Sequence, residues 1–385
     1  MSTPTVAYLD HAATTPVRPE ALEAMLPFYG ARFGNPSGSH RVARDARRAV
    51  DEARDVVAGC LGCRPSEVVF TGCGTEADSL AILGVLRARG GVAVCPSVEH
   101  HAVLDVVSHS GGRVVGVDRF GRVDLDALGA ALDPAVTVVS VMAVNNEVGA
   151  ITDLAAVAAV VRRHAPNALL HTDAVQAATW IDLRTLAGMV DLLSLSAHKF
   201  GGPKGVGVLY VRNGIALEPI LRGGGQEHER RSGTHNVAGI VAMAEALRLT
   251  DERRTDDVAR IRMLRDRLVD GVLAAVEGAV ETVPRNVKIA GSAHMCLPGV
   301  DSESLLFLLD DAGVCASAAS ACASGAMEPS HVLAGMGVSR ERALGAVRLT
   351  VGYTTTDADI DHALQVIPAA VERIRSRAVG RGAAS

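Results

Sequence analysis

One of the three lysines in the chain ends an apolar run, in the stretch SLSAHKFGGPKG. The lysines are Lys199, Lys204 and Lys288, and every other cationic side chain apart from histidine is arginine. Arginine keeps its proton near neutral pH, whereas a partly buried lysine can lose its proton and form a Schiff base. Lys199 is therefore a candidate nucleophile, although a surface lysine in a loop is the commoner case.

A carboxylate stands one strand–helix–strand repeat before this lysine. Asp173 ends the apolar run ALLHTD, and Gln176 follows it. A buried carboxylate is costly unless it is paired, and its partner could be a metal ion, a cationic side chain or a protonated ring nitrogen. A helix N-cap is the structural alternative. The spacing predicts that Asp173 and Lys199 emerge at the same rim of a sheet.

A glycine turn between a strand and a helix, in VVFTGCGTEADSLAI, could hold a phosphate. Gly72, Gly74 and Thr75 stand where the helix would begin, and unpaired N–H groups there favour an anion. The alternative is a tight turn with Thr75 as the N-cap. A phosphate cradle, Asp173 and Lys199 at one sheet edge match the needs of pyridoxal 5'-phosphate (PLP).

Further polar residues follow predicted strands or lie in small-residue loops. His100 or His101 in PSVEHHAVLD could stack on a planar ring or shuttle protons, and the amide of Asn145 or Asn146 in VMAVNNEVGA could bind a ring oxygen. The loop GGGQEHERRSGT, with Thr234, is suited to an anion. Arg348 could clamp a carboxylate, or be an exposed strand arginine. Cys322 in SAASACASG could be an exposed thiol, or an inert buried cysteine.

The elements that must position these residues alternate between short β-rich runs and alanine-rich helices. This alternation predicts an α/β fold with a mostly parallel sheet covered on both faces, in which ligands bind outside the carboxyl ends of the strands. A charged helix is predicted from Asp251 to about Glu277. We predict a large domain at 15–250 and a smaller α+β domain of 1–14 and 251–385, with a cysteine loop at about 315–328. The predicted strands are Val68–Phe70, Val92–Cys95, Val114–Val117, Val136–Val144, Ala168–Asp173, Leu192–Ser196 and Val206–Val211.

Composition narrows the classes of function. A net charge of −5 and a pI near 6.2 argue against a surface that binds nucleic acid directly. No apolar run approaches the length of a membrane span, and MSTPTVAYLD has no signal-peptide pattern. The seven irregularly spaced cysteines favour free thiols in a cytoplasmic protein. The lone CxxC of Cys60 and Cys63 lacks the further ligands of a zinc site, so no metal is expected.

Together these motifs resemble the cysteine desulfurases of the NifS/IscS type, in the class V aminotransferase group of PLP-dependent enzymes. The matching pieces keep the order and spacing of the family to about residue 360. The resemblance implies the PLP-dependent transferase fold type I, with a mostly parallel seven-stranded sheet, and a homodimer. The pieces are YLDHAATTPV, FGNPSGSH, TEADSLAI, EHHAVLD, VNNEVG, HTDAVQ, SAHKFGGPKGVG, GGGQEHERRSGT, SACASGAMEPSHVL and VRLTVGYTT.

The resemblance also implies a role for each matched residue. Lys199 would be the Schiff-base lysine, Cys322 the nucleophile that accepts sulfur, and His100 the stacking residue and acid/base. Arg348, with Asn35, would bind the substrate carboxylate. The implied cofactor contacts are Asp173 at the pyridine nitrogen, Asn146 and Gln176 at the ring oxygen, and Gly74, Thr75, Ser196 and His198 at the phosphate, joined by Thr234 from the other subunit of the homodimer.

The implied reaction moves the sulfur of L-cysteine onto Cys322 as a persulfide, releases L-alanine and passes the sulfur to an acceptor protein. That acceptor would be a scaffold, a thiolation enzyme or a sulfur carrier, in iron–sulfur cluster assembly or tRNA thiolation. A selenocysteine lyase or another class V aminotransferase-type enzyme is the alternative. A non-catalytic scaffold would not need both Lys199 and Cys322, and a dinucleotide-binding dehydrogenase would need a GxGxxG that is missing after the first strand.

The chain departs from the family pattern at a few positions. The cysteine loop reads SAASACAS where the family usually reads SSGSACTS, so that Ala319 replaces glycine and Ala323 replaces threonine. Alanine is less permissive than glycine, which predicts reduced travel of the loop. Cys73 stands in the phosphate loop where a smaller residue is usual, and Ser79 replaces an asparagine. The length of the cysteine loop matches the long-loop, IscS-like group.

Overall fold

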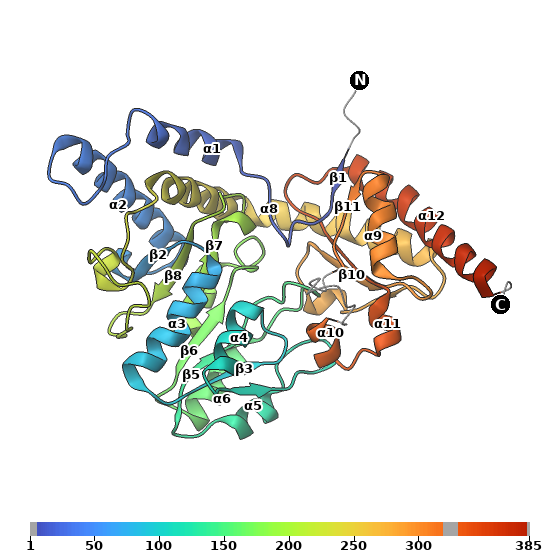
Figure 1. The fold of residues 1–385 in the computed structure, drawn as a ribbon, viewed down its shortest axis with the longest axis horizontal. Coiled ribbons are helices and arrows are strands. Elements are labelled where there is room, and N and C mark those ends of the chain that lie inside the picture. The colour runs from blue at the N-terminus through green and yellow to red at the C-terminus, as the bar shows by residue number, and fades with distance from the viewer. Residues whose placement is uncertain (1–5, 319–329, 383–385) are drawn as a thin grey trace.

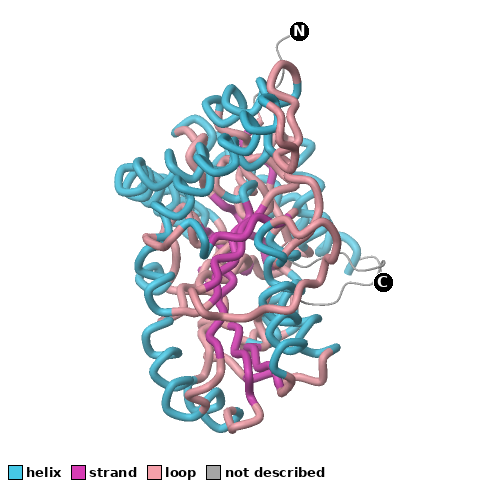
Figure 2. The backbone as a smooth tube through the Cα atoms, turned by 90° about the vertical axis from the view of Figure 1, so that its left-hand side faces the viewer, coloured by secondary structure: helices cyan, strands magenta, loops and turns pink. Residues whose placement is uncertain are grey.

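The structure, a computed structural model, describes residues 6–318 and 330–382. Its larger part is built on a seven-stranded sheet that Figure 2 shows between two layers of helices. The strands are β2 (Val68–Thr71), β3 (Val92–Pro96), β4 (Arg113–Val115), β5 (Val136–Ser140), β6 (Leu169–Asp173), β7 (Leu192–Ser196) and β8 (Gly207–Val211). Their order is β2-β8-β7-β6-β5-β3-β4, and all neighbours from β7 to β4 run parallel, while β8 runs antiparallel to β7 and β2.

This sheet confirms the predicted fold class. Every residue of β6, β7 and β8 is buried, because helices cover both faces, and strands in that position need apolar side chains almost throughout. Successive side chains of β8 enter opposite cores: Val208 and Tyr210 lie in one, and Leu209 and Val211 in the other. The apolar runs of the sequence therefore correspond to the central strands.

Two layers of helices complete the larger part of the molecule. The helices α3 (Gly74–Arg89) and α4 (His101–His109) bury their apolar sides on one face of the sheet. The opposite face is covered by α2 (Arg41–Leu61), α6 (Leu154–His164), α7 (Leu183–Met189) and the first half of α8 (Val237–Ala275).

The charged helix predicted from Asp251 is longer than its composition indicates. It is part of α8, one continuous helix of 39 residues that begins at Val237 and runs between the two parts of the molecule (Figure 1). Its first half packs against the large sheet, whereas Ile261 and Leu268 belong to a second core. The predicted start was wrong because the composition changes where the packing partner changes, while the helix itself continues.

The second core surrounds a three-stranded antiparallel sheet of order β12-β10-β9. The strands are β9 (Val280–Glu281), β10 (Ser292–Cys296) and β12 (Ala346–Thr350). Near the N-terminus, β1 (Ala7–Tyr8) pairs with β11 (Val314–Cys315), and Leu9 joins the same core. The other helices are α1 (Pro19–Met25), α5 (Leu125–Ala131), α9 (Ser302–Asp311), α10 (His331–Gly335), α11 (Arg340–Leu344) and α12 (Asp357–Gly382).

The predicted domain limits, 15–250 and 1–14 with 251–385, stay a prediction. The structure adds that α8 supplies side chains to both cores. In the part of the chain that the structure describes, no helix combines the length and apolarity needed to cross a membrane. The same residues contain no cluster of histidine, cysteine and acidic side chains that could hold a metal ion.

Candidate active site

A cavity of about 330 Å³ opens at the carboxyl ends of β6 and β7. This is where a mostly parallel sheet presents the side chains that follow its strands. Cys73 lines the cavity, as do Asp78, Ala12 and Met142, which no prediction singled out. The predicted site residues that line it are Gly74, Thr75, His100, Asn146, Asp173, Gln176, Ser196, His198, Lys199 and Arg348.

Lys199 lies in a short 3-10 turn (Ala197–Lys199) directly after β7. Its Nζ donates to the carbonyl oxygens of Ala12 at 2.6 Å and Ala13 at 2.9 Å. Burial, with the nearby cation of Arg348, lowers the pKa of Lys199 to about 8. The amine is therefore neutral far more often than a surface lysine, which is what attack on an aldehyde needs.

Asp173 is the last residue of β6 and is buried. Its Oδ1 accepts a hydrogen bond from the Val175 N–H at 2.9 Å. Burial raises the pKa of Asp173, while this hydrogen bond and the charges of His100 and Lys199 act in the opposite direction. A cation that enters the cavity would favour the ionised carboxylate, so Asp173 suits a protonated ring nitrogen.

The other end of the cavity is formed by the start of α3, whose N-cap is Cys73 and not Thr75. A Cβ on Gly74 would lie 2.8 Å from Val175 Cγ2 and 3.2 Å from Ser196 Cβ, so any larger residue would fill this space. The first N–H groups of a helix lack partners within the helix and attract anions. The chemistry of the cavity thus fits PLP, with phosphate donors at α3, a carboxylate for the ring nitrogen and an amine for the aldehyde.

His100 caps the start of α4. Its Nδ1 accepts from the Ala102 N–H at 3.1 Å, which leaves the proton of the neutral ring on Nε2. The ring is exposed to the cavity, while the protein packed around it lowers its pKa by desolvation, opposed by the charge of Asp173. A neutral imidazole can both stack on a planar ring and exchange a proton at Nε2.

Arg348 is buried in β12, where another side chain already contacts it. Its Nη2 forms a 2.7 Å ion pair with Asp10, and its Nη1 donates to the Asn146 carbonyl oxygen at 3.0 Å. Asp10 is a residue that the sequence analysis missed, although it stands in the matching piece YLDHAATTPV. A substrate carboxylate would approach an arginine that one carboxylate already orients.

Asp78 was also missed. It is fully buried beneath the cavity, 3.6 Å from His171 Nε2, and burial together with the charge of Asp173 raises its pKa. A carboxylate in the second turn of an amphipathic helix normally faces solvent, so no pattern in the sequence distinguishes it. Gln176 is placed by a hydrogen bond of 2.8 Å from its Nε2 to the carbonyl of Ala12, the same oxygen that binds Lys199.

Two predicted residues do not line this cavity, and a third is not among the residues that the structure describes. Asn35 is exposed in the loop before α2, where its Oδ1 accepts from the Ser37 N–H at 3.0 Å. Thr234 is exposed in the loop that precedes α8 and does not line the cavity of its own chain. Cys322 lies outside the described residues. The roles of all predicted site residues therefore stay predictions, although ten of them meet at one cavity.

Comparison with known proteins assigns the family. The profile of the family Aminotransferase class-V matches residues 7–363. The chain belongs to the class V aminotransferase family. Within it, the chain is 43% identical to an IscS-like cysteine desulfurase of Mycobacterium tuberculosis, over 99% of this chain and all of that protein. It is 40% identical to the cysteine desulfurase IscS of Dictyoglomus turgidum, over 96% of this chain and 95% of that one.

Solved structures of the class V family agree with this assignment. A NifS-like protein superimposes with a TM-score of 0.89 at 35% identity, covering 96% of this chain and all of that chain. A NifS-like protein from Rickettsia africae ESF-5 gives a TM-score of 0.86 at 28% identity, over 96% and 99% of the two chains. The resemblance to the NifS/IscS group and the fold type inferred from the motifs are both confirmed.

Proposed function

We propose that this chain is a PLP-dependent cysteine desulfurase, which takes sulfur from L-cysteine and releases L-alanine. The observation that carries the proposal is the half-buried Lys199, whose pKa is lowered to about 8 and which lines one cavity together with Asp173 and the start of α3. The chain also matches cysteine desulfurases over its full length. A plain aminotransferase has no need of a thiol, which favours the desulfurase through Cys322.

PLP, when bound, supplies an electrophilic aldehyde and a ring that withdraws electrons from the bonds being broken. Lys199 would hold the aldehyde end, and Asp173 the protonated nitrogen. Arg348 would bind the carboxylate of L-cysteine and so orient its amino group toward Lys199. The amine of Lys199 and Nε2 of His100 would then hold or release protons at the reacting carbon.

Cys322 would accept the sulfur. Its thiolate forms the new S–S bond as the C–S bond of the substrate breaks, and L-alanine leaves after a proton returns to its carbon. The persulfide would pass to an acceptor protein, which we propose to be a scaffold of iron–sulfur cluster assembly, a thiolation enzyme or a sulfur carrier. The six described cysteines are all free, as expected for a reducing compartment.

The first test is release of L-alanine from L-cysteine with a reductant present. The wild type should form alanine and sulfide in equal amounts, whereas Cys322→Ser should form neither and still bind the yellow cofactor. Lys199→Ala should lose the absorption of the covalently held cofactor. A wild type that binds the cofactor but forms no alanine would contradict the proposal and favour a selenocysteine lyase or an aminotransferase.

We also propose a homodimer in which Thr234 completes the site of the other subunit. The support is its exposed place in a loop away from the cavity of its own chain. Lys199→Ala and Thr234→Ala should each be impaired alone. If Thr234 acts across the interface, mixed dimers of the two variants contain one intact site and should regain part of the activity. No regain on subunit exchange would contradict a role of Thr234 across the interface.

A further inference from the structure

Glu147 is a buried carboxyl group to which the reaction outlined above gives no role. It follows Asn146 in the motif VNNEVG and is only 2% exposed. Its Oε2 accepts a hydrogen bond from Ser330 Oγ at 2.5 Å. Ser330 is the N-cap of α10 and the first described residue after the stretch that contains Cys322.

The residues on both sides of that stretch are held by contacts to neighbouring parts of the site. On its N-terminal side, the backbone of Ser317 pairs with that of Arg348, with N–O distances of 3.1 and 2.7 Å. On its C-terminal side, Ser330 binds Glu147. Arg348 also donates to the carbonyl oxygen of Asn146. Hydrogen bonds thus connect Ser317 through Arg348 to Asn146, and the next residue along the chain, Glu147, is hydrogen-bonded to Ser330.

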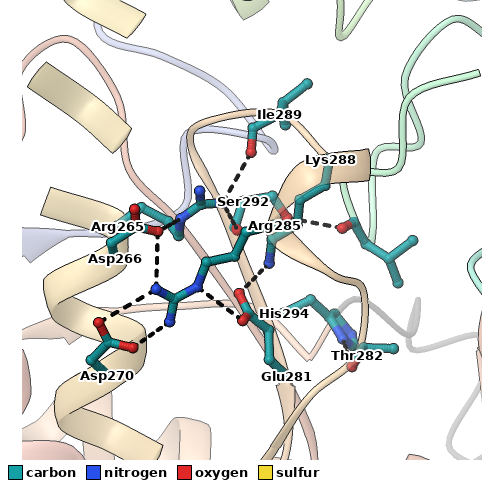
Figure 3. Close-up of polar contacts among 11 residues, drawn as sticks. Arg265, Asp266, Asp270, Glu281, Thr282, Arg285, Lys288, Ile289, Ser292 and His294 are labelled. Atoms are coloured by element: carbon teal, nitrogen blue, oxygen red, sulfur yellow. Dashed lines mark hydrogen bonds and ion pairs between the residues drawn. The ribbon is translucent and has the colours of Figure 1, made fainter. Parts of the chain in front are cut away.

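The backbone on which Glu147 stands is held firmly. Asn145 Oδ1 accepts from the N–H groups of Glu147 at 2.9 Å and Val148 at 3.0 Å. Ser292 Oγ, from β10 of the second sheet, donates to the Val148 carbonyl at 3.1 Å, and the Ile289 N–H donates to the Gly149 carbonyl at 3.0 Å. Figure 3 shows Ser292 within a dense polar cluster that supports this contact. The position of the Glu147 carboxyl is thus fixed from both parts of the molecule.

Glu147 is not well explained as a source of stability. Its Oε1 has no hydrogen-bond partner among the described residues, and it faces His294 Nε2, also without one, at 3.9 Å. Burial raises the pKa of Glu147 to about 7, against the effects of Ser330 and Arg348. A buried carboxyl group with half of its oxygens unpaired costs free energy, so an apolar residue would serve the fold at least as well.

We propose that Glu147 is a positioning residue for the sulfur-transfer step, acting through Ser330. Arg348 fixes the chain before the nucleophile-bearing stretch, and Glu147 fixes the chain after it. Arg348, the proposed ligand of the substrate carboxylate, is therefore connected to both flanks of the stretch that carries the nucleophile. This inference rests on the proposed function, because it assigns the sulfur acceptor to Cys322.

Loss of this one contact should leave α10 in place. Val332, Leu333 and Met336 of α10 and its C-cap are buried in an apolar cluster, and His331 Nε2 lies within hydrogen-bond distance, 2.9 Å, of the Glu99 carbonyl. Glu147→Ala and Ser330→Ala are therefore expected to fold. The structural effect of each substitution should be confined to the point where the chain enters α10.

The experiment compares two steps in the PLP-loaded enzyme. L-Alanine carries the amino and carboxylate groups of L-cysteine without its sulfur, so the absorption change that it causes reports substrate binding alone. A single turnover with L-cysteine, followed by trapping of the persulfide, reports sulfur transfer. Glu147→Ala should change the affinity for L-alanine less than about twofold and slow persulfide formation about tenfold, the size expected for one hydrogen bond to a charged group.

Conservative and double variants identify the contact responsible. Glu147→Gln and Ser330→Thr keep an acceptor and a donor, so each should recover most of the rate. Glu147→Ala/Ser330→Ala should be no slower than either single variant, because all three lack the same contact. Glu281→Gln, which removes the carboxylate paired with Lys288 and leaves the Glu147–Ser330 contact intact, should lower stability while keeping the rate of sulfur transfer.

Distinct outcomes would overturn the inference. Multiplicative losses in the double variant would show that the two residues act separately. Equal losses of L-alanine binding and of sulfur transfer in Glu147→Ala would indicate a general disturbance of the site, and an unchanged rate would remove the role altogether. A wild type that forms no alanine from L-cysteine would instead contradict the proposed function, before any variant is compared.

Discussion

Burial changes the chemistry available to single residues of this site. The clearest case is Lys199, which is enclosed between β7 and the N-terminal segment that carries Ala12. Desolvation disfavours the ammonium form, and the nearby Arg348 adds to this effect, so the pKa falls from 10.5 to about 8. The unfolded chain keeps the proton to higher pH. Stability contributed by this group therefore rises with pH between these two values.

The same shift predicts how the apoprotein takes up PLP. Only the neutral amine attacks the aldehyde, so the rate of covalent uptake should rise with pH and level off above a midpoint near 8, the lowered pKa of Lys199. Stopped-flow absorption at a series of pH values measures it. Lys204→Ala removes an exposed lysine and should behave like the wild type. A midpoint near the ordinary lysine pKa of 10.5 would contradict the burial argument.

At the scale of elements, the start of α3 is the place that we propose for the phosphate of the cofactor. Gly74 is needed because Val175 and Ser196 leave no room for a Cβ. Where no such constraint exists, a glycine within a helix only lowers the stability of the helix. Gly59 in α2 is such a case, because no atom lies within 4 Å of an added Cβ. Two glycines in two helices thus face opposite constraints, one set by the cavity and one by helix propensity.

This contrast gives a matched pair of variants. Gly74→Ala should weaken PLP binding about tenfold or more, since the added methyl group displaces the loop that faces the phosphate. Gly59→Ala should leave PLP binding unchanged and stabilise the protein by about 0.5–1 kcal/mol through helix propensity. Cofactor titration and urea unfolding measure the two effects. Equal PLP affinity in both variants would exclude the start of α3 as the anion site.

Sequence patterns predicted the sheet well because buried strands leave a local signature. All seven expected strands are present, and Asp173 and Lys199 stand at the ends of β6 and β7 as their spacing predicts. The missed contacts join distant positions. Asp10 and Arg348 are 338 residues apart, and Glu147 and Ser330 are 183 apart. The first pair forms within the second core and the other beside a separate apolar cluster, and both join segments that are distant in the sequence, so no local period reveals them.

At the scale of the whole molecule, a buried ion pair supports the junction between the two cores. Lys288 has no exposed side-chain surface and donates to Glu281 at 2.6 Å, beside the fully buried Arg265 of α8 (Figure 3). Burial lowers the pKa of Lys288 to about 8, while Glu281 acts in the opposite direction. Removing one partner of a buried pair costs far more than the pair contributes.

Glu281→Gln should therefore lower the free energy of unfolding by about 3 kcal/mol near neutral pH. The loss should shrink as the pH rises toward 8, because removal of Glu281 lowers the pKa of Lys288 further, so that the unpaired side chain sheds its proton and no buried charge remains. Urea unfolding at neutral and alkaline pH measures both parts of the prediction. A loss that is the same at all pH values would show that packing, and not charge, is responsible.

The length of α8 has a consequence for how the protein unfolds. Because one helix of 39 residues buries side chains in both cores, neither core can melt without exposing part of a helix on which the other depends. The two parts should therefore unfold together, in one cooperative step. Heating should give one transition, whose calorimetric and van't Hoff enthalpies agree, where two cores joined by a flexible linker would give two.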